Sequence, residues 1–415
     1  MRIAFVVAVF PPELEPASVM AGELVREWSR AGHEVLVICP FPNRPGGKIY
    51  PGYSRRPWKR YRVNGSDVLR VWSWLIGSRR RAVSRVLENL SFGLFSALAV
   101  LVTRKPDVIL MESWPILAQS TVIFAGKIRG VPVINYIKDV YPEAAVAAGV
   151  IKPGSFLEGF LTRGDRSVCR RSARNVVISE GMGELIAKRR DLPGERFTVI
   201  TDWLDLEAIR PFEGHSSWRK EVGIGNQEFV CLFAGTMGLA SGVDILLDVA
   251  EILRNENGIR LVCVGEGVLK DRMRTVTAEK NLGNLTLLPF QPRERVPEVQ
   301  SSADVLLLTS SPKMGVSSIP SKLITYLAVG RPVICSVSED SDLARLVRES
   351  GVGLVIKPGC PDSLAGAILK MLSLEKKVLS EMGQRARFIS VDRYSLYAAM
   401  VRFEKLFSDL LHNAA

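Results

Sequence analysis

Short apolar runs alternate with segments of helical spacing along almost the whole chain, and this alternation narrows the possible folds more than any other feature. Residues 2–9 form a nearly continuous apolar run, typical of a strand buried on both faces of a parallel sheet. The alternation restarts at residues 229–235 (FVCLFAG), after a linker at residues 202–226. The sequence therefore predicts an α/β protein with doubly wound parallel sheets.

The length of the chain indicates more than one domain. A single hydrophobic core rarely serves more than about 250–300 residues, and this chain has 415. Together with the restart of the strand pattern, the length predicts a first domain at residues 1–205 and a second at residues 206–389. Residues 40–64, rich in Pro, Gly and Arg, are expected to be irregular.

Several kinds of site are excluded by residue type. The six cysteines are dispersed without a C-x-x-C pair, which is typical of reduced thiols in a cytosolic protein. Of the three histidines, His33 lies in a helix-to-strand turn, and His215 and His412 lie in the linker and the tail, so no His-based triad or metal cluster is expected. The one D-x-D, at residues 340–342, is interpreted as a helix cap rather than a cation site. Catalysis must then use carboxylates, amides and substrate phosphates.

The excess of positive over negative charge lies entirely in the first half of the chain. Residues 1–200 hold 30 Lys and Arg against 17 Asp and Glu, whereas the remaining residues hold 25 against 26. The densest stretches, Arg55–Arg62 and Trp72–Arg81, interleave tryptophan with basic residues. Such stretches bind an anionic membrane surface or nucleic acid, or form a solvated face. We favour the membrane, because no nucleic-acid-binding motif is present.

No segment has the pattern of a signal peptide or a membrane span. The N-terminus, MRIAFVVAVFPPE, lacks a cleavage site, and the longest apolar run, Leu90–Val102, is shorter than the roughly 20 residues that a bilayer requires. The chain is therefore expected to be soluble or peripheral.

The stretch Ser310–Val333 is the strongest candidate for an anion site. A loop after an apolar strand leads into a helix that begins at Ser321, and the first N–H groups of a helix are free to bind an anion. Lys322 adds a full positive charge there. The alternative is an ordinary surface helix with a solvated lysine.

Two glycine turns follow strands of the second domain. Gly235, Thr236 and Gly238 follow the first of them, and Gly265-Glu266-Gly267 follow the next. Glycine allows the backbone to approach a phosphate, although each turn alone is a weak signal.

A cluster of polar residues, NYIKDVYPE, follows a buried strand of the first domain at residues 135–143. Active sites of α/β proteins lie at this end of the strands. Asp139 and Glu143 could orient an acceptor hydroxyl or stabilise a cationic transition state. The alternative is an Asx turn that caps a helix.

These segments together resemble the retaining GT-B glycosyltransferases of family 4, within the subgroup that builds bacterial surface polysaccharides such as colanic acid and O-antigen. The resembling pieces run in order over nearly the whole chain, and include FPPELEPASVMAGELVREWSRAGHEVLVICPFPN, KPDVILMESWP, VPVINYIKDVYPEAAVAAGVI, VITDWLDLEAIRP, FAGTMGLASGVDILLDVAEIL, LLPFQPRERVP and IPSKLITYLAVGRPV.

The resemblance implies two Rossmann-like domains that face a central cleft, with a final helix at about residues 390–415 crossing back onto the first. It implies metal-independent transfer with retention of configuration, without a cofactor. The second domain would bind the nucleotide sugar, with UDP favoured over GDP. Its expected contacts are Gly235, Thr236 and Gly238 at the phosphates, Gly265, Glu266 and Gly267 at the pocket floor, Phe290 and Gln291 at the base, Ser321 and Lys322 at the diphosphate, and Thr325 at the ribose.

The first domain would bind the acceptor, a glycan carried on a polyprenyl diphosphate, through Pro12, Glu13 and Asp139. Asp139, Glu143 and Lys322 are the expected catalytic residues. The protein would lie on the cytoplasmic face of the membrane, held there by its basic first half. No nucleic-acid partner is expected.

The chain departs from the family pattern in three places. Two glutamates of the family correspond to Ser317 and Thr325, a basic residue is replaced within Leu239–Gly242, and an asparagine is replaced by Asp202. The missing glutamates keep a non-catalytic GT-B binding protein open as an alternative. A sugar-nucleotide epimerase is a second alternative, although such enzymes rely on carboxylates and histidines that have no evident place in this sequence.

Overall fold

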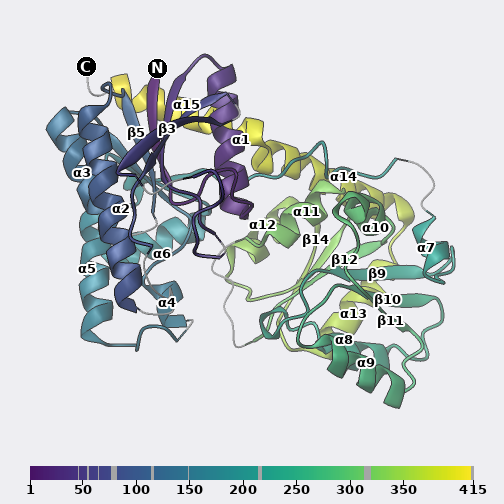
Figure 1. The fold of residues 1–415 in the computed structure, drawn as a ribbon. Helices are drawn as coiled ribbons and strands as arrows, with labels where there is room; N and C mark the ends of the chain where they lie inside the picture. Colours follow the sequence, from purple (N-terminus) through teal and green to yellow (C-terminus); the bar gives the residue numbers. More distant parts are fainter. Residues whose placement is uncertain are drawn as a thin grey trace. The chain divides into compact units, whose positions relative to one another are not determined.

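The computed structural model describes residues 1–44, 46–53, 56–63, 65–75, 82–113, 116–147, 149–213, 217–312 and 319–412. The chain forms two compact units (Figure 1). Unit 1 comprises Met1–Thr201 and the stretch from Ala399 onward, and unit 2 comprises Asp202–Ala398. Each unit is described by itself.

Within the described residues, unit 1 is built on one eight-stranded sheet in the order β3-β4-β2-β1-β5-β6-β7-β8. Neighbouring strands are parallel, except that β3 is antiparallel to β4. The strands are β1 (Arg2–Val6), β2 (Glu34–Pro40), β3 (Trp58–Val63), β4 (Ser66–Val71), β5 (Val108–Glu112), β6 (Val133–Ile137), β7 (Arg174–Val177) and β8 (Phe197–Val199).

The edge strand β3 corrects the expectation that residues 40–64 are irregular. Its sequence, WKRYRV, does not alternate apolar and polar residues over its length, and most of its side chains are exposed. Such a strand has no buried face to give an apolar period, so its sequence lacks the usual signal. Charged residues on an edge strand also prevent further strands from pairing with it.

Helices cover both faces of this sheet. They are α1 (Pro16–Arg30), α2 (Ala82–Val102), α3 (Ile116–Arg129), α4 (Glu143–Ala147), α5 (Phe156–Arg171), α6 (Glu180–Arg190) and α15 (Leu396–His412). On one face, the buried Trp28 of α1 packs on Phe5 of β1 and on Phe403 of α15, with ring centroids 5.8 and 5.5 Å apart. Ala4 and Val6 belong to a separate core cluster that contains side chains of α2 and α3.

Unit 2 contains a parallel sheet that has six strands in the described part of the chain, in the order β11-β10-β9-β12-β13-β14. The strands are β9 (Phe229–Ala234), β10 (Ile259–Val264), β11 (Leu285–Leu288), β12 (Val305–Thr309), β13 (Val333–Ser336) and β14 (Gly353–Ile356). The helices are α7 (Trp218–Glu221), α8 (Ile245–Ile252), α9 (Lys270–Glu279), α10 (Val296–Ser301), α11 (Ser321–Ala328), α12 (Asp342–Ser350), α13 (Pro361–Leu372) and α14 (Lys376–Tyr394).

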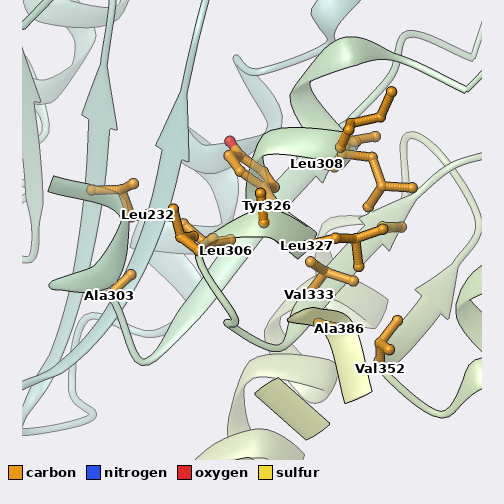
Figure 2. Packing of buried hydrophobic residues seen from close by; sticks show 14 of the residues in the cluster. Leu232, Ala303, Leu306, Leu308, Tyr326, Leu327, Val333, Val352 and Ala386 are labelled. Atoms are coloured by element: carbon orange, nitrogen blue, oxygen red, sulfur yellow. The ribbon is translucent and has the colours of Figure 1, made fainter. Parts of the chain in front are cut away.

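A buried cluster fixes α11 against the sheet of unit 2 (Figure 2). Leu327 of α11 lies among Leu306 of β12, Val333 of β13 and Ala386 of α14. The buried Tyr326 hydroxyl accepts a hydrogen bond from the backbone N–H of Ala234 at 2.8 Å. Because Ala234 ends β9, this bond sets the position of the first turn of α11 relative to the glycine turn that follows the strand.

Two further expectations are decided by local structure. Ser341 caps α12 by accepting a hydrogen bond from the N–H of Ala344 at 3.2 Å, and Asp342 lies in the first turn, so the cap interpretation of the D-x-D is confirmed. Among the residues that the structure describes, no helix is both long and apolar enough to traverse a bilayer.

Candidate functional site

The glycine turns of unit 2 meet at the carboxyl ends of β9 and β10. Gly235, Gly265 and Gly267 have φ angles of +144°, +159° and +152°, which residues other than glycine rarely adopt. A Cβ on Gly265 would lie 1.9 Å from the carbonyl oxygen of Gly235, and one on Gly267 would lie 2.4 Å from that of Met237. The backbones of the two turns are thus in direct contact.

Lys322 lies against the first of these turns. A Cβ on Gly235 would lie 2.6 Å from Cε of Lys322, and the amine lies 3.5 Å from the ring centroid of Phe233. Glycine at 235 therefore leaves room for the lysine. Two residues distant in sequence, a glycine after β9 and a lysine in the first turn of α11, form one surface.

The amine of Lys322 is largely removed from water. Burial lowers its pKa to about 8, and no acidic side chain contributes to the shift. None of the carboxylates in the described residues forms an ion pair with it. The Phe233 ring stabilises the cation only weakly. An anion that reached Lys322 would supply the charge partner that the folded protein lacks.

The first turn of α11 adds backbone donors beside Lys322. The N-cap residue is Pro320, which provides no side-chain cap, and its carbonyl accepts from the N–H of Leu323 at 2.9 Å. Among the described residues, the N–H groups of Ser321 and Lys322 have no hydrogen-bond partner and are available for an anion. Ser321 is exposed at this end. The Thr325 hydroxyl donates to the carbonyl of Lys322 at 2.8 Å, which leaves its oxygen able to accept a further hydrogen bond. Ser317 lies outside the described residues, as do His215, Arg55 and residues 76–81.

Of the other expected donor contacts, Thr236 and Glu266 belong to the glycine turns, and Phe290 and Gln291 follow β11. Thr236 and Phe290 are exposed, and Phe290 keeps 52% of its surface accessible. Gln291 donates to the carbonyl of Pro289 at 3.1 Å. The carboxylate of Glu266 is paired with Lys270 at 2.5 Å, while its backbone carbonyl accepts from Met237 at 2.8 Å. Glu266 therefore holds the turn through its backbone carbonyl, while its carboxylate is paired with Lys270.

The loop that contains Gly238 is anchored to β12. The Thr309 hydroxyl donates to the carbonyl of Ser241 at 2.7 Å, and the N–H of Ser311 donates to the carbonyl of Ala240 at 3.0 Å. At Gly242, with φ +56°, a Cβ would lie 2.7 Å from the backbone of Ser310. These contacts hold the loop against the end of β12.

In unit 1, the expected acceptor residues differ in accessibility. Pro12 and Asp139 are exposed, whereas Glu13 is 1% exposed. The Glu13 carboxylate accepts hydrogen bonds from the backbone N–H groups of Phe10, Asn43 and Arg44 at 3.3, 3.0 and 3.0 Å. In this position it joins two loops, and contact with an acceptor stays a prediction.

Glu143, predicted to be catalytic, belongs to a buried ion cluster. Its two oxygens accept from Arg190 at 2.7 and 2.8 Å, and Arg190 also donates to Asp165 at 2.6 Å. Burial alone would raise the pKa of Glu143, but Arg190 outweighs it and holds the pKa below the ordinary value. For Asp165 burial dominates and raises the pKa. A catalytic role for Glu143 stays a prediction, and its structural role is evident.

Sequence reasoning did not single out Arg70. This residue is fully buried on β4, where its guanidinium donates to the carbonyls of Pro40 at 2.8 Å and Phe10 at 3.4 Å. It thereby joins the same two loops as Glu13. The only signal in the sequence is an arginine within the apolar strand SDVLRV, and its partners cannot be read from that pattern.

Solved structures share this architecture over nearly the whole chain. The structure of HepE from Anabaena in complex with UDP covers 99% of this chain and 100% of that one, with a TM-score of 0.70 and 14% identity. At this identity the likeness shows the fold alone. The fold is that of the GT-B glycosyltransferases, as the sequence predicted.

Two protein-family models match the chain and specify which glycosyltransferases it belongs to. Residues 17–203 match the Glycosyl transferase 4-like domain, and residues 215–388 match Glycosyl transferases group 1. The two matches together span most of the chain, which therefore belongs to the glycosyltransferases that these two models describe. It is 24% identical to the glycosyltransferase assigned as WbjE in Pseudomonas aeruginosa, over 80% of this chain and 82% of that protein. It is 22% identical to WcaI of Escherichia coli K12, assigned to colanic acid biosynthesis, over 88% and 91% of the two chains.

Proposed function

We propose that the protein transfers a sugar from a nucleotide sugar, a UDP sugar rather than a GDP sugar, to a glycan acceptor carried on a polyprenyl diphosphate. The product would be an intermediate of a bacterial surface polysaccharide. The observation that carries the proposal is Lys322, a desolvated cation without an acidic partner, lying against Gly235. The UDP bound by HepE and the assigned role of WcaI support the donor and the pathway.

The donor diphosphate would bind across the glycine turns and the first turn of α11. Lys322 would neutralise part of its charge, and backbone N–H groups would position it. Since the free amine has a pKa of about 8, a bound diphosphate would raise that pKa and fix the ammonium form. Gly265 and Gly267 would form the floor, with Phe290 and Gln291 at the base and Thr325 at the ribose.

The chemistry would retain the anomeric configuration, without a metal ion or a cofactor. As the sugar–phosphate bond breaks, negative charge grows on the leaving diphosphate, where Lys322 and the helix dipole stabilise it. The leaving phosphate itself would accept the proton of the attacking hydroxyl. Asp139, exposed after β6, would orient that hydroxyl or stabilise the cationic sugar.

The acceptor would bind to unit 1, with the protein peripheral on the cytoplasmic face of the membrane. The excess of positive charge in residues 1–200 supports this location. On β3, the described part of the basic stretch, Trp58 is 52% exposed beside the exposed Lys59 and Arg60.

Calorimetric titration with UDP, GDP and their sugars tests the donor site. Lys322→Met keeps the length of the side chain but removes its charge, and should weaken UDP binding about 10- to 100-fold, the worth of a charged hydrogen bond. The matched control, Lys370→Ala on the exposed side of α13, should bind as the parent does. Equal affinity of Lys322→Met and the parent would refute the phosphate site.

Transfer to a polyprenyl-diphosphate glycan separates an enzyme from a non-catalytic binding protein. Asp139→Asn should retain UDP affinity and lose at least about 100-fold in transfer rate. A parent protein that binds UDP but neither transfers nor hydrolyses the donor sugar would favour the non-catalytic alternative, which the missing carboxylate at Thr325 keeps open.

A further inference from the structure

The outer surface of α2, α3 and α5 has a composition unlike that of a water-exposed helical layer. These helices lie side by side on unit 1 (Figure 1). Every position of α2 from residue 86 onward that is exposed carries an aliphatic side chain. These side chains are Val86, Leu87, Leu90, Leu94, Leu98 and Val102. A solvent-facing helix normally presents charged residues there, so something other than water is expected to cover this face.

The apolar surface continues onto the two neighbouring helices. On α3, Phe124 and Ile128 keep 65% and 58% of their surface exposed. At the start of α5, Phe156, Leu157 and Phe160 are 86%, 52% and 53% exposed. Large aromatic side chains with this accessibility are costly in water.

A row of four arginines lies between the middle of α5 and its C-terminal end. Arg163, Arg166, Arg170 and Arg171 are all exposed and line one hollow of the surface with Ser167. Arg171 also lines a second hollow with Phe124 and Ile128, so the cationic and apolar parts are contiguous. Only Arg166 has a carboxylate partner among the described residues, Asp191 at 2.7 Å.

Acidic side chains are few on this surface, where Glu88 of α2 and Glu158 of α5 are only partly exposed. Among the exposed positions of α2, α3 and α5 that the structure describes, none is Asp or Glu. In a two-fold dimer the same patch would face itself, and the four arginines would find fully exposed carboxylates at none of its described helix positions. A lipid bilayer with anionic headgroups satisfies both halves of the surface, because apolar side chains enter the acyl boundary while arginines bind phosphates.

We propose that this α2–α3–α5 face docks unit 1 onto an anionic membrane, with α2 and α5 lying in the plane of the interface. The proposal goes beyond the basic stretches that the sequence singled out, since it assigns docking to different residues. It builds on the peripheral location proposed above. Nucleotide binding depends on Lys322 in unit 2, and the two proposals can therefore fail separately.

Cosedimentation of the full chain with vesicles tests the face. The parent should bind vesicles of phosphatidylglycerol and phosphatidylcholine in equal parts more tightly than vesicles of phosphatidylcholine alone. Leu90→Glu with Leu94→Glu should lower the partition coefficient at least about tenfold on both kinds of vesicle. The matched control is Phe388→Glu on α14, a side chain that is 70% exposed, and it should leave binding unchanged.

The arginine row is tested on the anionic vesicles. Each arginine removed should lower binding about fivefold, so Arg163→Ala with Arg170→Ala should lower it about 25-fold. The control, Lys370→Ala with Lys377→Ala on unit 2, should not. UDP titration and a thermal melt on every variant establish that each is folded.

Three results would overturn the proposal. The first is a folded parent protein that binds neither kind of vesicle. The second is binding that survives the changes on α2 and α5 and is lost when β3 loses Lys59 and Arg60. The third is a parent that dimerises in sedimentation velocity and becomes monomeric as Leu90→Glu with Leu94→Glu, which would assign the face to a second copy.

Discussion

One buried charged group in each unit differs from the other in the partners that surround it. In unit 1 the cluster of Arg190, Glu143 and Asp165 satisfies its members, with separations of 2.6–2.8 Å. In unit 2 Lys322 is also largely buried, yet it faces an aromatic ring and a glycine turn. Buried ions with partners stabilise a fold, whereas a desolvated cation without an acidic partner is ready for a ligand. The comparison therefore separates structural charges from a binding charge.

The largest expected effect is on the satisfied cluster. Arg190→Ala leaves Glu143 and Asp165 in a buried site without their cation, and should lower the free energy of unfolding by about 3–5 kcal/mol. Arg189→Ala is the control, because that side chain is half-exposed and lies 3.3 Å from Glu143; it should cost less than about 1 kcal/mol. Chemical denaturation measures both, and similar losses would contradict the structural role of the cluster.

Gly235→Ala should damage the ligand site of unit 2. The new Cβ would lie 2.6 Å from Cε of Lys322, on a backbone with φ +144°, so the lysine and the turn must both move. We expect UDP affinity to fall at least about 100-fold, equivalent to about 3 kcal/mol. Gly366→Ala on α13 is the control, since a Cβ there meets no atom within 4 Å. Normal UDP binding by Gly235→Ala would show that the lysine does not need this approach.

The pH dependence of stability tests the unpartnered cation. The pKa of Lys322 is about 8 in the folded protein, below the 10.5 of an ordinary lysine, so the unfolded chain binds more protons between these values. Relative to Lys322→Met, the parent should therefore gain about 3 kcal/mol in unfolding free energy as pH rises from 8 to 10.5. UDP-sugar affinity of the parent should fall over the same range. Parallel stability curves for parent and variant would contradict the assigned burial.

The smallest effect is expected at Glu13. Glu13→Gln replaces one carboxylate oxygen with an amide group that cannot accept from a backbone N–H, and one of three hydrogen bonds is lost. The unfolding free energy should fall by about 1–2 kcal/mol. The exposed Glu195→Gln is the control. Unchanged stability together with weaker acceptor binding would restore Glu13 to the acceptor site.

The sequence predicted those parts of the molecule whose signal is local. Buried parallel strands carry continuous apolar runs, so β1 and β9 were recognised, and the helix that begins at Ser321 was placed correctly. The anion site at Lys322 stays a prediction. Strand β3 was missed because it is exposed on the sheet edge. The partners of Glu143 and Glu13 were beyond reach, because Arg190 and Asn43 follow them by 47 and 30 residues. Likewise, nothing in the local sequence places the Phe233 ring beneath Lys322.

The depressed pKa of Lys322 also has a consequence for chemical labelling. With a pKa of about 8, roughly a tenth of these amines are unprotonated at pH 7, against less than a thousandth for an ordinary lysine. An acylating reagent at neutral pH should therefore modify Lys322 ahead of solvent-exposed lysines wherever the reagent can reach it. Bound nucleotide should suppress the modification, so peptide mapping by mass spectrometry would report occupancy of the site at a single residue.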